Sequence, residues 1–479
     1  MKILTSTDLK NWSGTLECQS QIPLLIRKLV YAGVDIDDIK MIDFPFAEDV
    51  QTGGYDGQLE VEKGNSKIPD GASVWEFGVV ETGKKAKADD DYNKRKADPL
   101  GRNPSDTTYV NVTLKKYSKK QEWMDEKNAE GFWADVRFYD AVDIEHWLDL
   151  APSVEIWLAR LLGKPVVGVQ CAGDYWEQWS TKEDQVFPYE LLLGSRDEQR
   201  QQIVDFLLDN NQKVRRIKSN TREESLAFIL AVIESLNDDE KNAICSKALV
   251  VENLDSYRQL VESQNKLILL PKFRLDDVDI NRTMVKGHKL IIPLSNSFTS
   301  NDSNIILLPI VRSEAFRDGL KKMGINSEQA QLLSVTTGKD ISVLRRNLQF
   351  SSKQPIWFEL NDPLRFVPFL LAARFDAGYE GDREIIEKIS KSEYTEYEKY
   401  LKKILNGDET PIYNIGTKWR LISHADSWLY LAKFITDEDL ESFYKIAVEV
   451  LTESNPKYGL DPEKRYMASF YKATPKYSN

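Results

Sequence analysis

The sequence predicts an α/β protein of three parts: a mixed sheet flanked by helices, a doubly wound α/β unit, and a mainly helical C-terminal region. Three observations support this prediction. The chain has 479 residues, more than one hydrophobic core usually serves. Helical and strand-like segments alternate up to about residue 313. Beyond that point apolar residues recur almost entirely at helical spacing.

The first part, residues 1–165, is expected to open with a helix. Apolar residues recur at helical spacing from Leu16 to Ala32, and Gly33 marks the end of the helix. Short strands follow, bounded by Gly53, Gly54 and the turn at 69–71. The predicted strands are 57–61, 73–80, 109–113 and 134–139, with helices at 84–96, between the last two strands, and at 144–162. This order describes a mixed sheet covered by helices.

The second part, residues 184–350, alternates helices and strands as a parallel sheet does. The predicted strands are 214–217, 248–251, 267–270, 289–293 and 305–308, and the predicted helices include 196–208 and 223–236. From Ser313 the pattern becomes helical, with Phe316, Leu320 and Met323 on one face and a break at Gly338.

The third part, residues 355–479, is mainly helical. The segment 412–421 (IYNIGTKWRL) predicts a small hairpin among these helices, and a helix is expected at 437–451. A hairpin beside helices is typical of a winged-helix-like domain.

Composition is that of an ordinary soluble protein, with 41% hydrophobic and 29% charged residues. We find no apolar run long enough to span a membrane and no signal-peptide pattern, so we expect a cytoplasmic protein. The three cysteines are far apart and argue against disulfides or a zinc site. The net charge of -12 counts against a nucleic-acid partner, but the segment 84–120 has a local charge of +6.

Two acids and one lysine are the candidate catalytic residues. Asp56 lies in GGYDG at a strand start, and Glu76 lies in the apolar strand VWEFG, where an unpaired buried carboxylate would be expensive. Binding of a divalent metal by Asp56 and Glu76 would explain both. Gly78, two residues after Glu76, leaves space on the same strand face, and we expect Lys87 of the next helix to reach it.

The motifs GGYDG, PDGASVWEFG, KADDDYNKR, TTYVNVT and WADVRFYDAVDIEHWL resemble the PD-(D/E)xK (restriction-endonuclease-like) nuclease superfamily. The resemblance covers residues 1–165 and is to a branch whose lysine has moved from the strand to the following helix. It implies catalytic roles for Asp56, Glu76 and Lys87, with Mg²⁺ or Mn²⁺ as cofactor. It also implies an additional acid at Glu17 and an auxiliary helix motif at Tyr92 and Lys94. The expected DNA-binding residues are Tyr92, Lys94, Lys115, Lys116 and Lys119.

The second part lacks a phosphate-binding loop. After the strand at 214–217 the sequence reads KSNTREES, without the glycines and lysine of GxxxxGK[ST]. Glu223 and Glu224 stand there instead and would repel a triphosphate. The segment ALVVENLD resembles a Walker B strand, with Glu252 and Asp255 either as acids or as ordinary strand-end residues. With the helical segment 316–350, this part resembles a degenerate STAND or AAA-like NTPase domain, for which we assign no nucleotide-binding residues and expect no ATP hydrolysis.

The leading hypothesis is a metal-dependent endonuclease effector that cleaves double-stranded DNA under the control of a non-hydrolysing STAND-like domain. This combination resembles bacterial anti-phage defence proteins, which implies a homo-oligomer, a defence-system partner protein and no membrane. The alternative is a non-catalytic DNA-binding or assembly scaffold that retains the nuclease fold. An NTPase motor is a third interpretation.

Overall fold

The computed structural model describes residues 2–45, 54–78, 84–181, 185–209, 211–296, 298, 304–348, 355, 357 and 362–452. The chain divides into two compact units. Unit 1 is Met1–Tyr175, Asn210–Val214 and Ile233–Ile291, and unit 2 is Trp176–Asp209, Arg215–Val232 and Ile292–Asn479. Strands β7 (Val214–Lys218) and β10 (Lys289–Leu294) begin in unit 1 and end in unit 2, so the segment 184–350 contributes to both.

A five-stranded mixed sheet forms the core of the N-terminal part. Its strands are β1 (Ile39–Asp43), β2 (Gly57–Val61), β3 (Gly71–Gly78), β4 (Thr107–Thr113) and β5 (Asp135–Tyr139), in the order β1-β2-β3-β4-β5. The first three strands pair antiparallel, and β3, β4 and β5 pair parallel. The predicted mixed sheet is therefore confirmed. Strand β1 was not predicted, because Lys40 and Asp43 interrupt the apolar pattern of this short edge strand.

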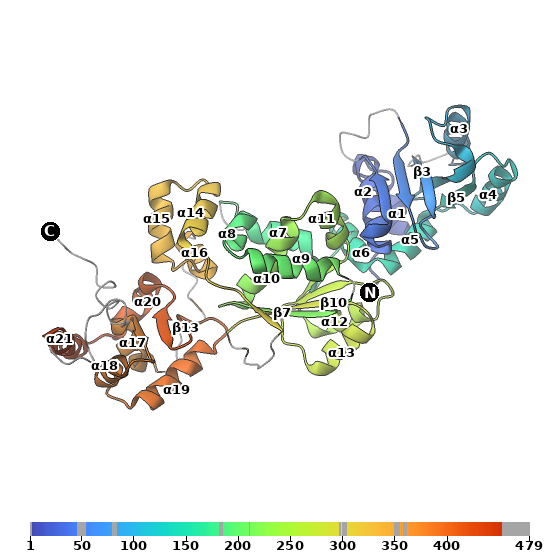
Figure 1. Ribbon diagram of the computed structural model, residues 1–479. Coiled ribbons are helices and arrows are strands. Elements are labelled where there is room, and N and C mark those ends of the chain that lie inside the picture. Colours follow the sequence, from blue (N-terminus) through green and yellow to red (C-terminus); the bar gives the residue numbers. More distant parts are fainter. Residues whose placement is uncertain are drawn as a thin grey trace. The chain divides into compact units, whose positions relative to one another are not determined.

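Helices cover both faces of this sheet (Figure 1). They are α1 (Ser6–Trp12), α2 (Leu16–Gly33), α3 (Lys84–Ala97), α4 (Lys120–Ala129), α5 (Ala141–Leu150) and α6 (Pro152–Leu161). Because side chains alternate along a strand, Trp75 and Phe77 pack with α2, whereas Val74 packs with α3 and α4. Glu76 follows the same alternation as Val74 and belongs to the face that α3 covers.

A six-stranded sheet follows, in the order β11-β7-β10-β9-β8-β6. Its further strands are β6 (Val169–Cys171), β8 (Ala248–Val251), β9 (Ile268–Pro271) and β11 (Ile305–Leu307). The pairs β8–β9, β9–β10 and β7–β11 are parallel, and β6 is an antiparallel edge strand that was not predicted. Strands β8, β9 and β10 are buried throughout, as in a parallel sheet covered on both faces.

The helices associated with this sheet are α7 (Ala172–Ser180), α8 (Tyr189–Leu193), α9 (Asp197–Leu208), α10 (Arg222–Glu234), α11 (Asp238–Cys245), α12 (Leu254–Val261) and α13 (Asp277–Val285). They alternate with the strands along the chain, as the predicted doubly wound arrangement requires.

The remainder of unit 2 is mainly helical. Its helices are α14 (Ser313–Lys322), α15 (Ser327–Thr336), α16 (Ile341–Leu348), α17 (Val367–Ala372), α18 (Glu380–Ser390), α19 (Tyr394–Leu405), α20 (His424–Leu431) and α21 (Asp437–Thr452). The predicted hairpin is confirmed as β13 (Ile412–Ile415) and β14 (Lys418–Leu421), and β12 (Arg374–Asp376) adds a third antiparallel strand. Short 3-10 turns lie at Ile36–Asp38, Pro104–Asp106, Pro363–Phe366 and Ala432–Phe434.

The predicted break at Gly338 separates α15 from α16. Its φ of 61° suits glycine, and a Cβ there would collide with the carbonyl oxygen of Ile422. Nearby, Arg346 pairs with Glu409 and Asp426 at 2.6 and 2.8 Å. The segment around Gly338 and α16 therefore contacts the chain on either side of the β13–β14 hairpin within unit 2. In the described part of the chain, no helix is both long and apolar enough to cross a membrane.

Candidate active site

The two predicted metal-binding acids lie together where β2 begins and β3 ends. Asp56 directly precedes β2, and its Oδ2 accepts a hydrogen bond of 2.7 Å from the backbone N–H of Phe77. Glu76, the preceding residue on β3, is 4% exposed. The turn before β2 therefore brings the Asp56 carboxylate to the point on β3 where Glu76 projects towards α3.

The two carboxylates influence each other electrostatically. Burial, followed by the negative charge of Asp56, raises the pKa of Glu76 to about 7, and this value already includes the opposite effect of Arg95. Burial also raises the pKa of Asp56, and the hydrogen bond from Phe77 partly offsets that effect. A pair of acids that resists ionisation in the free protein is one that a divalent cation would stabilise in the ionised form.

Lys87 lies where the glycine at 78 leaves room for it. A Cβ at Gly78 would stand 3.8 Å from Cγ of Lys87, so the lysine packs against the bare backbone of β3. Its ammonium pairs with Asp91, one helical turn further along α3. The predicted position of the displaced lysine thus agrees with this structure, although its amine contacts Asp91 and not Glu76.

Two functional candidates on α3 were missed from the sequence. The guanidinium of Arg95 pairs with Glu76, donates to the carbonyl oxygen of Gly54, and lies 4.8 Å from the ring centroid of Tyr55. Asp91 is buried, and its Oδ2 has no hydrogen-bond partner among the described residues. A spacing of four residues places Lys87, Asp91 and Arg95 on one face of a helix. This spacing could have identified Asp91 and Arg95 from the sequence.

The donor set fits a hard divalent cation in its chemistry. Asp56, Glu76 and Asp91 supply carboxylate oxygens, which Mg²⁺ and Mn²⁺ prefer. However, no group of three or more acidic, histidine or cysteine side chains within the described ranges is arranged to hold a metal. The contact between Arg95 and Glu76 gives a physical reason, because it directs the Glu76 carboxylate towards a guanidinium. Because Arg95 engages one oxygen of Glu76, it competes with a cation for this carboxylate.

Glu17 lies exposed in the first turn of α2. It is not among the groups with the largest effects on the pKa of Asp56 or Glu76. An additional acid at this position remains a prediction from the resemblance.

The predicted DNA contacts separate into buried and exposed residues. Tyr92 is fully buried and packs edge-on against Tyr109 and Trp123, so its role in this structure is in the core. Lys115 is also buried, at 4% exposure. Lys94, Lys116 and Lys119 are exposed, and Lys119 pairs with Glu122 at 3.9 Å.

Ion pairs neutralise much of the positive segment 84–120. Lys85 pairs with Glu126, Lys96 with Glu130, and Lys120 with both Asp140 and Asp143. The local charge of +6 counted along the sequence therefore overstates the positive potential that DNA would meet.

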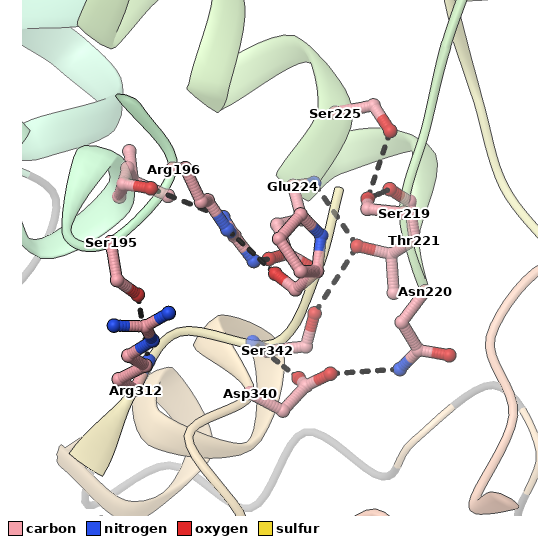
Figure 2. Close-up of polar contacts among 12 residues, drawn as sticks. Ser195, Arg196, Ser219, Asn220, Thr221, Glu224, Ser225, Arg312, Asp340 and Ser342 are labelled. Carbon is pink, nitrogen blue, oxygen red and sulfur yellow. Dashed lines mark hydrogen bonds and ion pairs between the residues drawn. The ribbon is translucent and has the colours of Figure 1, made fainter. Parts of the chain in front are cut away.

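In unit 2, side chains fill the place of the missing phosphate loop (Figure 2). The hydroxyl of Ser219 bonds to the Thr221 carbonyl and to Ser225 at 2.7 and 2.8 Å, and the Thr221 hydroxyl accepts from the backbone of Glu224. Glu224 forms a buried ion pair with Arg196 at 2.7 Å. The loop between β7 and α10 is thus held by its own hydroxyl groups.

The other acids noted in the second part have ordinary partners or surroundings. Glu223 accepts a hydrogen bond of 3.0 Å from the indole of Trp179. Glu252, at the end of β8, pairs with Lys272 at 2.8 Å, and Asp255 is exposed in the first turn of α12. These contacts favour the interpretation of Glu252 and Asp255 as strand-end polar residues.

No family model matches the chain, and a search of curated proteins finds no match.

Proposed function

We propose that residues 1–165 are a metal-dependent endodeoxyribonuclease of the PD-(D/E)xK type. The observation that supports this proposal best is the electrostatic coupling of two buried carboxylates, Asp56 and Glu76, beside the helix-borne Lys87. An apolar sheet does not retain two such acids at a stability cost without a compensating role. Phosphodiester hydrolysis with Mg²⁺ or Mn²⁺ provides that role.

Each residue has a distinct task in this proposal. Asp56 and Glu76 would hold the cation, with Asp91 as an additional oxygen donor, and a bound divalent ion would supply a water of lowered pKa and polarise the phosphate. Lys87 gives up Asp91 and neutralises charge on the phosphate. The exposed lysines Lys94, Lys116 and Lys119 position the DNA backbone.

The remainder of the chain would regulate the nuclease. A STAND-like second part and a winged-helix-like third part would make the protein an effector, as in bacterial anti-phage defence, that acts on double-stranded DNA. Cutting both strands requires two active sites, which favours a homo-oligomer. A second protein of the defence system would supply the activating signal.

The alternative is a non-catalytic DNA-binding or assembly scaffold that retains a nuclease fold. The ion pair between Arg95 and Glu76 favours it, because this contact engages one of the two acids in a structural role. The ion pairs of Lys85, Lys96 and Lys120 also favour it, because they reduce the positive charge that segment 84–120 presents to DNA.

Plasmid cleavage distinguishes the two functions. Purified protein is incubated with supercoiled plasmid and Mn²⁺ or Mg²⁺, with and without EDTA, beside the variants Asp56→Asn and Glu76→Gln. Glu62→Gln is the matched control, because Glu62 is an exposed acid directly after β2. An enzyme cuts only with metal, loses cutting in both site variants, keeps it in the control, and binds DNA equally in all four forms. A parent protein that binds DNA without metal-dependent cutting supports the scaffold.

A further inference from the structure

A cavity of about 580 Å³ opens within unit 2 at the carboxyl ends of adjacent strands. Its walls include Lys218–Asn220 at the end of β7, Asn296 after β10 and Leu307–Ile310 at the end of β11. Strands β7 and β11 are parallel, and β10 runs alongside β7, with Leu290 donating to Lys213 and Ser219 to Leu294. Ligands of open α/β sheets bind at this edge, and the volume suits a small molecule.

Two lysines supply positive charge to this cavity. Lys218 comes from β7, and Lys339 from the turn before α16. Lys218 donates to the carbonyl oxygen of Phe298 at 2.8 Å, and within the described part of the chain neither ammonium forms an ion pair with a carboxylate. Burial lowers the pKa of both lysines, and Arg420 lowers that of Lys339 further. An arriving anion would stabilise both charges.

The two acids of the cavity wall are already engaged (Figure 2). Glu224 is paired with Arg196, whose remaining donors bond to the carbonyl oxygens of Pro309 and Leu192. Asp340 accepts from Asn220 at 2.8 Å and from the backbone N–H groups of Ser342 and Val343. The repulsion expected from Glu224 in the sequence is therefore offset by Arg196. Asp340 is hydrogen-bonded to neutral groups only, so the two lysines outnumber the one acid of the wall that is not paired with a cation.

The rest of the wall suits an uncharged organic group. Leu307, Ile415 and Ile422 provide apolar surface, while the amides of Asn296, Asn406 and Asn414 provide donors and acceptors. An inorganic anion would use only the lysine side of such a cavity.

We propose that this cavity binds a small organic phosphate with one or two phosphate groups, with the phosphate between Lys218 and Lys339 and the organic group against the apolar and amide wall. Lysine ammonium groups bind phosphate as point charges. A magnesium triphosphate is disfavoured, because both carboxylates that face the cavity are committed to other partners and none is left to hold the ion. The proposal does not depend on the nuclease function.

Ligand binding to the full-length protein tests the proposal. Isothermal titration and thermal unfolding are measured in EDTA with AMP, ADP, ribose 5-phosphate, inorganic phosphate and adenosine, and separately with ATP and magnesium. At least one of the three organic phosphates should bind saturably and at least tenfold more tightly than inorganic phosphate or adenosine. Lys218→Met should weaken binding at least tenfold, since one charge-assisted hydrogen bond contributes about 1.5–3 kcal/mol, or a factor of about ten or more.

A second variant is matched to the backbone at the other lysine. Lys339 has a φ of 63°, and Lys339→Asn removes the charge while keeping a residue that tolerates this conformation. It should weaken binding at least tenfold as well. Lys399→Met is the control, because Lys399 is exposed on α19 and pairs with Glu396.

Several results would overturn the proposal. They are the absence of saturable binding by all three organic phosphates, equal binding of inorganic phosphate, unchanged binding in both site variants, and binding that occurs only with magnesium and ATP. The proposal would also be overturned if Lys399→Met weakened binding as much as the two site variants do.

Discussion

Removal of Arg95 should destabilise unit 1 in a manner that depends on pH. Arg95 and Glu76 are both buried, with side-chain exposures of 5% and 6%. Removing one partner of a buried ion pair costs about 3–5 kcal/mol, because the other charge stays buried without compensation. Arg95→Met should lower the free energy of unfolding by this amount at pH 8.5. The loss should be smaller at pH 6, where Glu76 escapes the penalty by binding a proton.

A double variant separates the charge from the packing. In Glu76→Gln/Arg95→Met the buried carboxylate is absent, so only the contact with the Tyr55 ring and the bond to Gly54 are lost, about 2–3 kcal/mol together. The double variant should therefore be more stable than Arg95→Met at pH 8.5 by about 1 kcal/mol or more, and its own free energy of unfolding should not depend on the titration of residue 76, because it has no acid there. Arg137→Met is the control, because its pair with Asp135 is partly exposed and should contribute less than about 1 kcal/mol.

Urea denaturation of the parent protein and these three variants at pH 6 and pH 8.5 measures the differences. Mn²⁺ should also stabilise Arg95→Met more than the parent protein, because the cation no longer competes with the guanidinium for Glu76. A loss below 1 kcal/mol, or an equal loss at both pH values, would show that Arg95 does not stabilise a buried charge on Glu76.

Three further predictions concern single side chains. Folding raises the pKa of Glu76 from 4.5 to about 7, so the folded protein holds this proton at pH values where the unfolded chain has lost it. The stability of the parent protein relative to Glu76→Gln should therefore fall by about 3 kcal/mol as pH rises from 4.5 through 7. Urea titrations at several pH values measure this fall. Tyr92→Ala should lower the free energy of unfolding by about 3–5 kcal/mol in urea denaturation, because the ring is buried. Tyr92→Phe should change this free energy little, and DNA binding in gel-shift assays little as well, since the Tyr92 hydroxyl makes only a long hydrogen bond of 3.4 Å. Arg346→Met should cost about 3–5 kcal/mol in thermal unfolding, because the buried Asp426 would lose the guanidinium that pairs with it, and a loss below 1 kcal/mol would contradict this.

The sequence was most informative where residue type and periodicity agree. The central strands of both large sheets, α2 and α3 were predicted to within a few residues, because long apolar patterns reflect burial directly. Strands β1, β6 and β12 were missed, since short edge strands owe their place to a neighbour and have little pattern of their own.

Within the candidate site, the sequence predicts which residues belong to the site better than it predicts which side chains they contact. Asp56 and Glu76 stand out because a carboxylate in apolar or glycine-rich surroundings is unusual, and the empty position at Gly78 identified the helix lysine. The partner of Glu76 was not predictable, because Arg95 in a lysine-rich helix has the same sequence pattern as a surface cation. Tyr92 shows the converse, since an aromatic residue within a charged helix can face the core.

Buried arginines have opposite consequences at the two sites. In unit 1, Arg95 engages one oxygen of Glu76, an acid that the proposed nuclease needs, so it competes with a metal ion for this carboxylate. In unit 2, Arg196 neutralises Glu224, an acid that would repel an anionic ligand, so the pair can remain intact while Lys218 and Lys339 hold the proposed phosphate. A ligand in unit 2 therefore needs no rearrangement of its ion pairs, whereas a metal in unit 1 would compete with one. In the proposed nuclease, weakening of the contact between Arg95 and Glu76 would consequently favour metal binding.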